Sequence, residues 1–427
     1  MYQFPETNKF RAREVLELDF DIREQDRARE LYVELDEARG DAYREELLYL
    51  LSIDEDELKA GSDRYVKVIF SGHRGCGKSL ELYRIHQYLN NPDRYVSLFI
   101  DMERELEIAH FQPEDFFVTI IVWLIDLVKE QELEVDLKPL NTLAEDWLNE
   151  DHEVRKEWKE EQGEAASVEA KAGLGFWDWL SFNVGIKSFF TGTSKISRTL
   201  RQQIRKEPLK LQAQLNSLIE QVRKEVVQKG KGRDLLLVFD GTEKIRYEIY
   251  KNLFVQDSFL IRELKVNLIC AVPINAFYDI QTGVTSDAYE RVVLPMFKIT
   301  DDNAHLFKDI ISKRVDLEAF FAAEALDIIV HYSGGCPRQL LKIASTALRK
   351  ALGKKVEKQH AEAAIHLLGQ EMFERLEKAH VEIIQQQAFE HADEDIKELL
   401  FSLAVLKYNG KRKTNPLLNE FIPADER

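Results

Sequence analysis

One short segment of the 427-residue chain has residue types and a spacing suited to binding phosphate. Gly72-His-Arg-Gly-Cys-Gly-Lys-Ser79 fits the pattern G-x-x-x-x-G-K-[ST]. The glycines let the backbone turn so that successive N–H groups face one centre, and a following helix N-terminus adds partial positive charge. Lys78 would reach phosphate oxygens, and the Ser79 hydroxyl would ligate Mg²⁺. We therefore expect a nucleotide phosphate site formed by Gly72, His73, Arg74, Gly75, Cys76, Gly77, Lys78 and Ser79.

The elements around this segment must place it correctly. The short apolar, β-branched run 66–70 predicts a strand, and a helix is expected from about Gly77 to Leu89. A P-loop requires a strand before it and a helix after it. A glycine-rich turn that matches the motif by chance does not require these neighbours. The context favours a P-loop, in which Lys78 contacts the β- and γ-phosphates.

A second acidic position follows another predicted strand. Leu235-Leu-Leu-Val-Phe-Asp240 places Asp240 at the carboxyl end of a buried strand, where open α/β sheets bind their ligands. Its expected role is to hold Mg²⁺ through water, alongside Ser79. The alternative is an aspartate that only caps the strand end or the next helix.

Further periodicities predict the fold class. Apolar runs at 95–100, 266–272 and 292–299 predict three more strands, and 116–129 and 211–226 predict helices. This alternation indicates an α/β fold with a parallel sheet covered on both faces. After residue 300 we expect helices at 301–315, 319–332 and 337–352, then a helical C-terminal region ending in a hairpin turn at Asn409-Gly410.

The segment between about 130 and 195 is expected to be an insertion. Residues 129–169 are strongly acidic, a composition that is usually solvated and often mobile. Alternation at 167–176 and 180–187 predicts a hairpin with Trp177 and Trp179 at its tip. Packing of that tip on the chain's own surface is favoured over an assembly or lipid contact.

Composition excludes several classes of protein. The net charge of −17 disfavours general DNA binding, and three cysteines, Cys76, Cys270 and Cys336, cannot form a disulfide framework. The charged N-terminus is not a signal peptide, and the longest uncharged runs fall short of the roughly 20 residues of a membrane span. A cytoplasmic location is expected. Cys76 and Cys336 are read as small fillers, with a nucleotide-linked redox role as the alternative.

The order of these features resembles a known group of proteins. A Walker A segment, a Walker B strand, a further strand and then helices containing Gly334-Gly-Cys-Pro-Arg338 look like AAA+ and STAND ATPases, in particular prokaryotic origin-recognition-like and KAP-like NTPases. The likeness covers about residues 60–370. It implies an ATPase that uses ATP and Mg²⁺, with Arg338 as the sensor 2 arginine of a helical lid. A surface salt bridge is the alternative for Arg338.

Pattern and resemblance together divide the chain into four parts. The helical, charged pattern of residues 1–60 predicts a lead-in, and a P-loop core is expected at 61–300, with the insertion inside it. A helical lid would follow at 301–370, and a degenerate winged-helix-like region at 371–427.

The catalytic residues carried over from the resemblance depart from the usual AAA+ pattern in one place. A glutamate normally follows the Walker B aspartate, but Gly241 stands there. Asp240 and Glu243 instead match a D-x-x-D-like spacing, and Glu243 is expected to orient the attacking water. Its alternative role is as a partner of Lys244, Arg246 or a helix N-terminus.

Two further assignments come from the same resemblance. Asn275 is the candidate for sensor 1. Arg291 is the first choice for an arginine finger that acts on a neighbouring subunit, with Arg262 second and an ordinary surface arginine as the alternative. Together the expected catalytic residues are Lys78, Asp240, Glu243, Arg338 and Arg291.

The resemblance implies a nucleotide-driven switch. Such a chain would form a homo-oligomer and act with a separate effector in prokaryotic conflict, including antiviral (anti-phage) defence, or in regulation. One alternative is a DNA-binding initiator that uses a basic wing at Lys407, Lys411, Arg412 and Lys413. Its DNA binding would be weak, because four cations are few against the overall negative charge. Another alternative is an ATP-binding scaffold with little hydrolysis.

Overall fold

The computed structural model describes most of the chain. The described residues are 4–17, 30–59, 64–165, 175–181, 189–190, 194–256, 258–282, 288–391 and 393–423. No helix within these ranges is long and apolar enough to cross a membrane.

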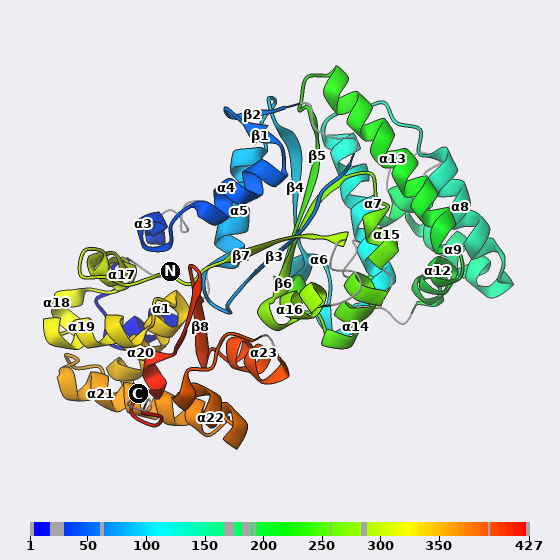
Figure 1. The fold of residues 1–427 in the computed structure, drawn as a ribbon. Helices are drawn as coiled ribbons and strands as arrows, with labels where there is room; N and C mark the ends of the chain where they lie inside the picture. Colours follow the sequence, from blue (N-terminus) through cyan, green and yellow to red (C-terminus); the bar gives the residue numbers. More distant parts are fainter. Residues whose placement is uncertain are drawn as a thin grey trace.

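A five-stranded parallel sheet forms the centre of the larger part of the molecule (Figure 1). Its strand order is β4-β5-β6-β3-β7, and each pair within it is parallel. The strands are β3 (Lys67–Gly72), β4 (Tyr95–Asp101), β5 (Asp234–Asp240), β6 (Asn267–Pro273) and β7 (Glu290–Leu294). The predicted α/β fold with a parallel sheet is confirmed.

The register brings the carboxyl ends of the strands to one edge. Gly72 at the end of β3 pairs with Pro273 of β6 and Leu294 of β7, and Asp101 of β4 pairs with Asp240 of β5. The residues that immediately follow these strands therefore lie at the same edge of the sheet. Open α/β folds bind their ligands at this edge.

Successive side chains of each strand point to opposite faces of the sheet, and each face is covered by an apolar layer. Val68 and Phe70 of β3 pack with α4 (Ala42–Leu50) and α5 (Lys78–Leu89), while Ile69 faces the layer that contains α7 (Pro113–Glu130) and α13 (Pro208–Gln228). Figure 1 shows α4 and α5 on one side of the sheet and α7 and α13 on the other. Helices on both faces explain why the strands are apolar throughout.

Strand β7 is shorter than the predicted run 292–299. It ends at Leu294, and the backbone N–H of Met296 donates 2.8 Å to the carbonyl of Lys407 in the C-terminal region. The apolar residues beyond 294 are buried because they meet other parts of the chain, not because they continue the sheet.

The insertion is helical where the structure describes it. It contains α8 (Lys138–Asn149), α9 (His152–Ala165), α10 (Phe176–Trp179) and α12 (Lys195–Lys206). The predicted hairpin tip is wrong, because Trp177 and Trp179 lie in a helix, although both are buried against their own chain as expected. Residues 166–174 and 182–188, which hold most of the predicted strands, lie outside the described residues.

The acidic run 129–169 is not simply a solvated segment. Trp147 and Trp158 are buried, and Trp158 makes edge-to-face contact with Phe176 at 5.3 Å between ring centroids. The charges occupy the outer sides of helices whose apolar sides join the main core, so a charge count alone misjudged this segment.

A second, helical part of the molecule follows the sheet (Figure 1). It contains α17 (Ala304–Ser312), α18 (Leu317–Phe320), α19 (Ala323–Tyr332), α20 (Pro337–Lys350) and α21 (Lys358–Phe373). The chain then forms α22 (Lys378–Gln386), α23 (Glu394–Phe401) and the antiparallel hairpin of β8 (Val405–Tyr408) and β9 (Lys411–Thr414). The predicted turn at Asn409-Gly410 joins these two strands.

The N-terminal residues run between the two parts. Helix α1 (Arg11–Glu17) buries Ala12, Val15 and Leu16 in the core of the helical part, whereas α4 packs on the sheet. Between them lies the short helix α3 (Asp36–Arg39). The helical lead-in expected at 1–60 is thus divided into separate helices within its described part.

Candidate nucleotide-binding site

The glycine-rich loop 72–79 joins the end of β3 to the start of α5. Gly75 and Gly77 adopt φ angles of +79° and +89°, a left-handed conformation that favours glycine. A Cβ atom at Gly75 would also lie 2.5 Å from the Cβ of Arg338. Backbone conformation and close packing therefore both require the glycine pattern seen in the sequence.

Lys78 is folded into this loop. Its side chain is only 6% exposed, and its Nζ donates to the carbonyl of Gly72 at 3.2 Å. The same Nζ lies 3.8 Å from Oε1 of Glu243. The Glu243 carboxylate, from the segment after β5, thus lies next to the Lys78 ammonium group, which is the group that a bound phosphate would contact.

Asp240 lies at the end of β5 and is 5% exposed. Burial, and next the charge of Glu243, raise the pKa of Asp240 to about 6, although a hydrogen bond from the Ser79 hydroxyl acts in the opposite direction. Ser79 and Asp240 are therefore brought together, as the expected Mg²⁺ site requires.

Several buried oxygens at this edge lack partners. Among the described residues, Oδ1 of Asp240, Oγ1 of Thr242 and Oε2 of Glu243 are buried without a hydrogen bond. Unpaired buried oxygens are costly, and carboxylate and hydroxyl oxygens are the ligands that Mg²⁺ prefers. The chemistry of these donors fits a hydrated Mg²⁺ with a phosphate.

The departure at Gly241 has a conformational reason. Gly241 has a φ of +77°, and a Cβ there would lie 3.3 Å from the backbone nitrogen of Glu103. A glutamate at this position would be strained. The turn leads into a short 3-10 helix, Thr242–Lys244, which brings Glu243 back toward Lys78.

Asp101 is a third acidic residue at this edge, and sequence analysis missed it. It pairs with Asp240 across β4 and β5, and its carboxylate accepts hydrogen bonds from the backbone N–H groups of Glu103 and Arg104. The charge of Asp101 also contributes to the raised pKa of Asp240. Its position directly after the predicted strand 95–100 was the signal that could have revealed it.

Sheet order, loop and acidic edge together decide the fold type. The loop follows β3, an interior strand of the parallel sheet, and Asp240 ends β5, two places away. This is the fold of a P-loop NTPase.

Comparisons with known proteins add little to this assignment. No family model and no curated protein matches the chain. Among solved structures it is similar to the Orc1 protein of Aeropyrum pernix in complex with DNA, at 12% identity and a TM-score of 0.38, with 96% of each chain covered. It is also similar to Cdc6p of Pyrobaculum aerophilum, at 12% identity and a TM-score of 0.36, covering 91% of this chain and 99% of that one. These TM-scores are too low to support a statement about activity.

The helical part contacts the P-loop through the start of α20. Pro337 occupies the first turn of α20, as expected, and Cys336 precedes it. Sγ of Cys336 lies 3.6 Å from the carbonyl oxygen of Gly75, and Arg338 packs directly on Gly75. The predicted sensor 2 residue is therefore placed at the loop.

The cysteines are buried fillers where the structure describes them. Cys76, Cys270 and Cys336 are free and buried, and burial raises the pKa of Cys336 to about 11. A buried thiol with a raised pKa holds little thiolate at neutral pH, which disfavours a redox role for Cys336.

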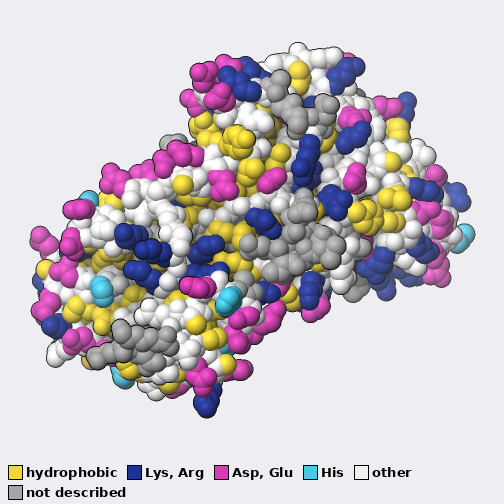
Figure 2. Space-filling view, in the orientation of Figure 1, with side chains coloured by type: hydrophobic (Ala, Val, Ile, Leu, Met, Phe, Trp, Pro, Cys, Tyr) yellow, Lys and Arg dark blue, Asp and Glu magenta, His cyan; other side chains and the backbone are white. Residues whose placement is uncertain are grey.

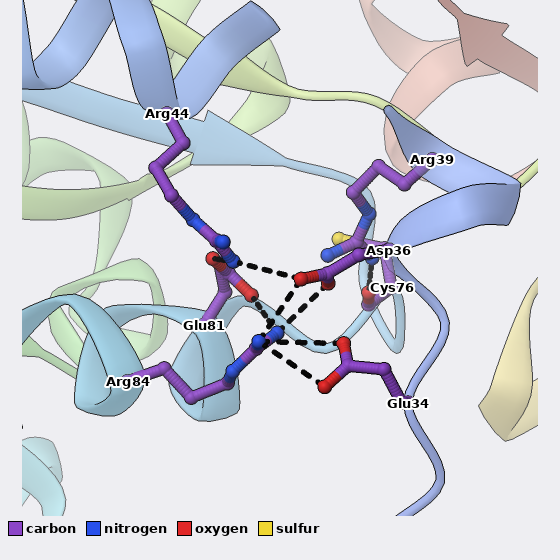
Figure 3. Close-up of polar contacts among 7 residues, drawn as sticks. All are labelled: Glu34, Asp36, Arg39, Arg44, Cys76, Glu81 and Arg84. Carbon is purple, nitrogen blue, oxygen red and sulfur yellow. Dashed lines mark hydrogen bonds and ion pairs between the residues drawn. The ribbon is translucent and has the colours of Figure 1, made fainter. Parts of the chain in front are cut away.

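Arg39 also reaches the P-loop, which the sequence did not indicate (Figure 3). Its guanidinium donates to the carbonyl of Cys76 and lies 3.7 Å from the ring centroid of Phe297. Arg39 is 5% exposed, and its Nε has no partner within the described part of the chain. The N-terminal segment is therefore part of the site rather than only a lead-in.

A network of ion pairs holds that segment on α5 (Figure 3). Arg84 of α5 donates to Asp36 at 2.8 Å, and Arg44 of α4 donates to Glu81 of α5 at 2.8 Å. Glu81 is 3% exposed, so its charge is compensated by arginine rather than water. These pairs place Arg39 at the loop.

The C-terminal region contacts the P-loop through His73. Nδ1 of His73 lies 3.0 Å from the carbonyl of Leu400, and Nε2 lies 2.7 Å from the backbone nitrogen of Lys407. Lys407 is the donor to Nε2, so the proton of the neutral ring is on Nδ1. Burial lowers the pKa of His73 to about 3.

The remaining predicted residues are Asn275, Arg262 and Arg291. Asn275 follows β6 by two residues, and its Oδ1 is buried without a partner in the described structure. Arg262 is exposed at the end of α15 (Ser258–Arg262). Arg291, in β7, lines a cavity shared with the C-terminal hairpin. The structure thus gathers Lys78, Ser79, Asp240, Glu243 and Arg338, and leaves Arg291 facing a different part of its own chain.

Proposed function

We propose that this chain binds and hydrolyses ATP as a molecular switch of the AAA+ type. The observation that carries this is the contact of three segments, far apart in sequence, with one phosphate-binding loop. Arg338 of the helical part packs on Gly75, Arg39 of the N-terminal segment donates to Cys76, and the hairpin residue Lys407 donates to His73. A change in the loop on nucleotide binding would reach all three.

The residues of the site divide the work of binding. The backbone of the loop and Lys78 hold the phosphates, and Ser79 with Asp240 would hold the hydrated metal. When bound, Mg²⁺ supplies positive charge at the phosphate oxygens. Arg338, at the start of α20, would donate to phosphate and so link the lid to the nucleotide.

Glu243 would act at two stages. Without nucleotide it stands 3.8 Å from Lys78 and partly neutralises the lysine charge. Phosphate oxygens compete for that lysine, which frees the Glu243 carboxylate to accept a proton from the attacking water. The same ion pair would therefore keep the nucleotide-free loop in one conformation and supply the base when ATP is bound.

The binding step is tested with Lys78→Ala. We expect loss of high-affinity binding of a fluorescent ATP analogue in titration, with circular dichroism unchanged. Lys244→Ala is the matched control, because Lys244 lies near the site but is exposed and pairs with Glu103. Binding by the Lys78 variant equal to that of the wild type would refute the P-loop assignment.

An oligomer and a separate effector, in defence or regulation, belong to the same proposal and rest on the resemblance described above. Arg291 remains the proposed arginine finger; in the single chain it lines a cavity with the C-terminal hairpin, so it would have to leave that cavity to reach a neighbouring site. Mixing Arg291→Ala with Lys78→Ala chains should restore part of the ATPase rate if a neighbouring subunit completes the site. Absence of any restoration would contradict a shared site.

DNA binding is the second candidate, favoured by the order of α22, α23 and a hairpin with exposed Lys411 and Lys413. The other two cations of the predicted wing are used within the chain. Lys407 donates to Tyr278, and Arg412 donates to the carbonyl of His391. On the face seen in Figure 2, basic side chains are interspersed with acidic ones. We therefore expect weak binding that falls steeply with salt.

A fluorescence-anisotropy titration with duplex DNA tests this candidate. A nanomolar complex at about 0.15 M salt, lost in a Lys411→Ala, Lys413→Ala double variant, would favour the DNA-binding function. Weak binding at low salt only would leave the switch without a DNA ligand.

A further inference from the structure

A cavity of about 580 Å³ lies outside the P-loop, between the sheet edge and the C-terminal hairpin. Its volume is in the range of small-molecule sites. Its walls come from α4, β7, α16 (Ile274–Thr282), the segment after α22, and the hairpin. The lining residues are Glu46, Phe277, Tyr278, Arg291, Val293, Pro295, Glu390, Lys407, Tyr408, Asn409, Gly410 and Arg412.

The three cationic side chains of this cavity differ in their hydrogen bonds to the rest of the chain. Lys407 donates to the Tyr278 hydroxyl at 3.1 Å, and Arg412 donates to the carbonyl of His391 at 2.7 Å. Arg291 is half-buried and lines the cavity, and its enclosed Nη1 has no hydrogen-bond partner among the described residues. Because Nη1 itself has almost no accessible surface, an anion in the cavity would meet the guanidinium through its other nitrogens and supply a counter-charge to it.

Aromatic rings form another part of the wall. The ring of Tyr278 lies 5.2 Å from the Arg412 guanidinium carbon and 5.5 Å from Nζ of Lys407. Phe277 and Tyr278 meet edge to face at 5.3 Å between centroids. Rings flanked by cations suit a planar, electron-rich group that stacks next to a negative charge.

The two carboxylates of the lining complete the chemistry. Glu46 and Glu390 are exposed residues of the lining, and as carboxylates they can accept hydrogen bonds from hydroxyl or amino groups of a ligand. A ligand with an anion for Arg291, a planar ring for the aromatic wall and hydroxyl donors for the carboxylates has the composition of a nucleotide. We propose that this cavity is a second ligand site, for a nucleoside monophosphate.

The site is separate from the P-loop but connected to it. Lys407, which lines the cavity, also donates its backbone N–H to His73 of the loop. Tyr408, next to it, donates to the carbonyl of Gly334 at 2.7 Å, just before α20. A ligand here would act on the hairpin that holds both the loop and the lid helix.

Isothermal titration with 5′-AMP, 5′-GMP, 5′-CMP and 5′-UMP tests the proposal. Lys78→Ala removes the P-loop lysine, so binding that persists in this variant comes from elsewhere. We expect at least one monophosphate to saturate the wild type and Lys78→Ala equally. Arg291→Ala should weaken that binding about tenfold or more, as expected for loss of a charged hydrogen bond.

Two controls keep this result specific. Lys411→Ala removes an exposed cation of the same hairpin outside the cavity lining and should leave binding unchanged. Arg291→Lys keeps the charge but loses the planar fork, and it guards against misfolding of the alanine variant. It should bind less tightly than the wild type, with an unchanged melting temperature.

Other outcomes overturn the proposal. Absence of binding by all four monophosphates at millimolar concentration would do so, as would binding that is lost in Lys78→Ala and kept in both Arg291 variants. Inorganic phosphate that binds as tightly as the best monophosphate would show an anion site without nucleoside recognition. Because the titrations measure binding alone, none of these results depends on whether the chain hydrolyses ATP.

Discussion

The backbone N–H of Lys407 donates a hydrogen bond to Nε2 of His73 over 2.7 Å, across a sequence separation of 334 residues. The other ring nitrogen contacts the carbonyl of Leu400. Both nitrogens of a fully buried ring are thus used by the C-terminal region. The glycine-rich loop 72–79 and the C-terminal region that contains the hairpin are therefore joined by hydrogen bonds through one side chain.

Removal of this link should destabilise the protein. His73→Ala loses two buried hydrogen bonds and leaves a cavity, so we expect a loss of about 2–4 kcal/mol in the free energy of unfolding. Urea denaturation measures it. His110→Ala, at an exposed position, is the control and should change little. A His73 variant as stable as the control would show that the link contributes nothing.

The same histidine predicts a pH dependence. The pKa of His73 is about 3 in the folded protein, against about 6.5 in the unfolded chain, so the unfolded chain binds more protons between these values. Its contribution to stability is therefore complete above pH 6.5 and is lost as the pH falls through this window, by up to about 1.4 kcal/mol per pH unit.

The comparison of wild type with His73→Gln isolates this contribution, since other groups titrate in both proteins. Urea denaturation at pH 7.5, 6.5 and 5.5 should show the stability difference between them shrinking or reversing as the pH falls. A difference that stays constant over this range would mean that His73 takes up its proton as readily in the folded protein as in the unfolded chain.

The ionisation of Asp240 changes stability with pH in the opposite direction to that of His73. Its folded pKa of about 6 lies above the unfolded value of about 3.8, so the folded state binds more protons in that window and the ionised carboxylate costs stability above pH 6. Asp240→Asn should raise the stability of the nucleotide-free protein at pH 7.5 by on the order of 1–3 kcal/mol, and should abolish Mg²⁺-dependent turnover. Thermal melts at pH 5 and 7.5 check it. A variant destabilised equally at both values would contradict the prediction.

Glu243→Gln separates a catalytic from a structural role. If Glu243 is the general base, this variant keeps ATP affinity but slows single-turnover hydrolysis by roughly 10²-fold or more. Glu248→Gln, at an exposed position five residues on, is the matched control and should hydrolyse ATP like the wild type. Equal single-turnover rates for Glu243→Gln and the wild type would assign Glu243 to pairing with Lys78 alone.

Arg39 should matter for nucleotide affinity, because its guanidinium supports the loop at Cys76 and stacks on Phe297. Arg39→Ala is expected to weaken binding of the ATP analogue about tenfold and to lower the melting temperature. Arg39→Lys should restore only part of the affinity, since an ammonium group lacks the planar face. Arg13→Ala, in the exposed part of α1, should leave affinity unchanged. An Arg39→Ala variant that binds like the wild type would limit this residue to a structural role.

The sequence by itself determined the parts of this protein that depend on short-range patterns. The strand that ends at Gly72, the helix from Lys78 and the strand that ends at Asp240 are six to twelve residues long, and the periodicity of such short runs reflects local geometry. The glycine spacing of the loop follows from backbone conformation in the same way. The ends of elements were predicted less accurately, as the end of β7 shows. An apolar run indicates that its residues are buried, but not which part of the chain buries them.

Only the tertiary structure decided which distant residues meet the loop. Trp177 and Trp179 lie between two alternating segments, a pattern that predicts a hairpin tip, yet they form a helix that the neighbouring helices of the insertion bury. Arg39 has no distinctive local pattern, and the contacts of Asp101 with the adjacent strand and of His73 with the hairpin cannot be read from the short patterns that contain these residues. Periodicity records which face of an element is apolar. It does not record which polar group of another segment lies opposite, because that depends on how the whole chain packs.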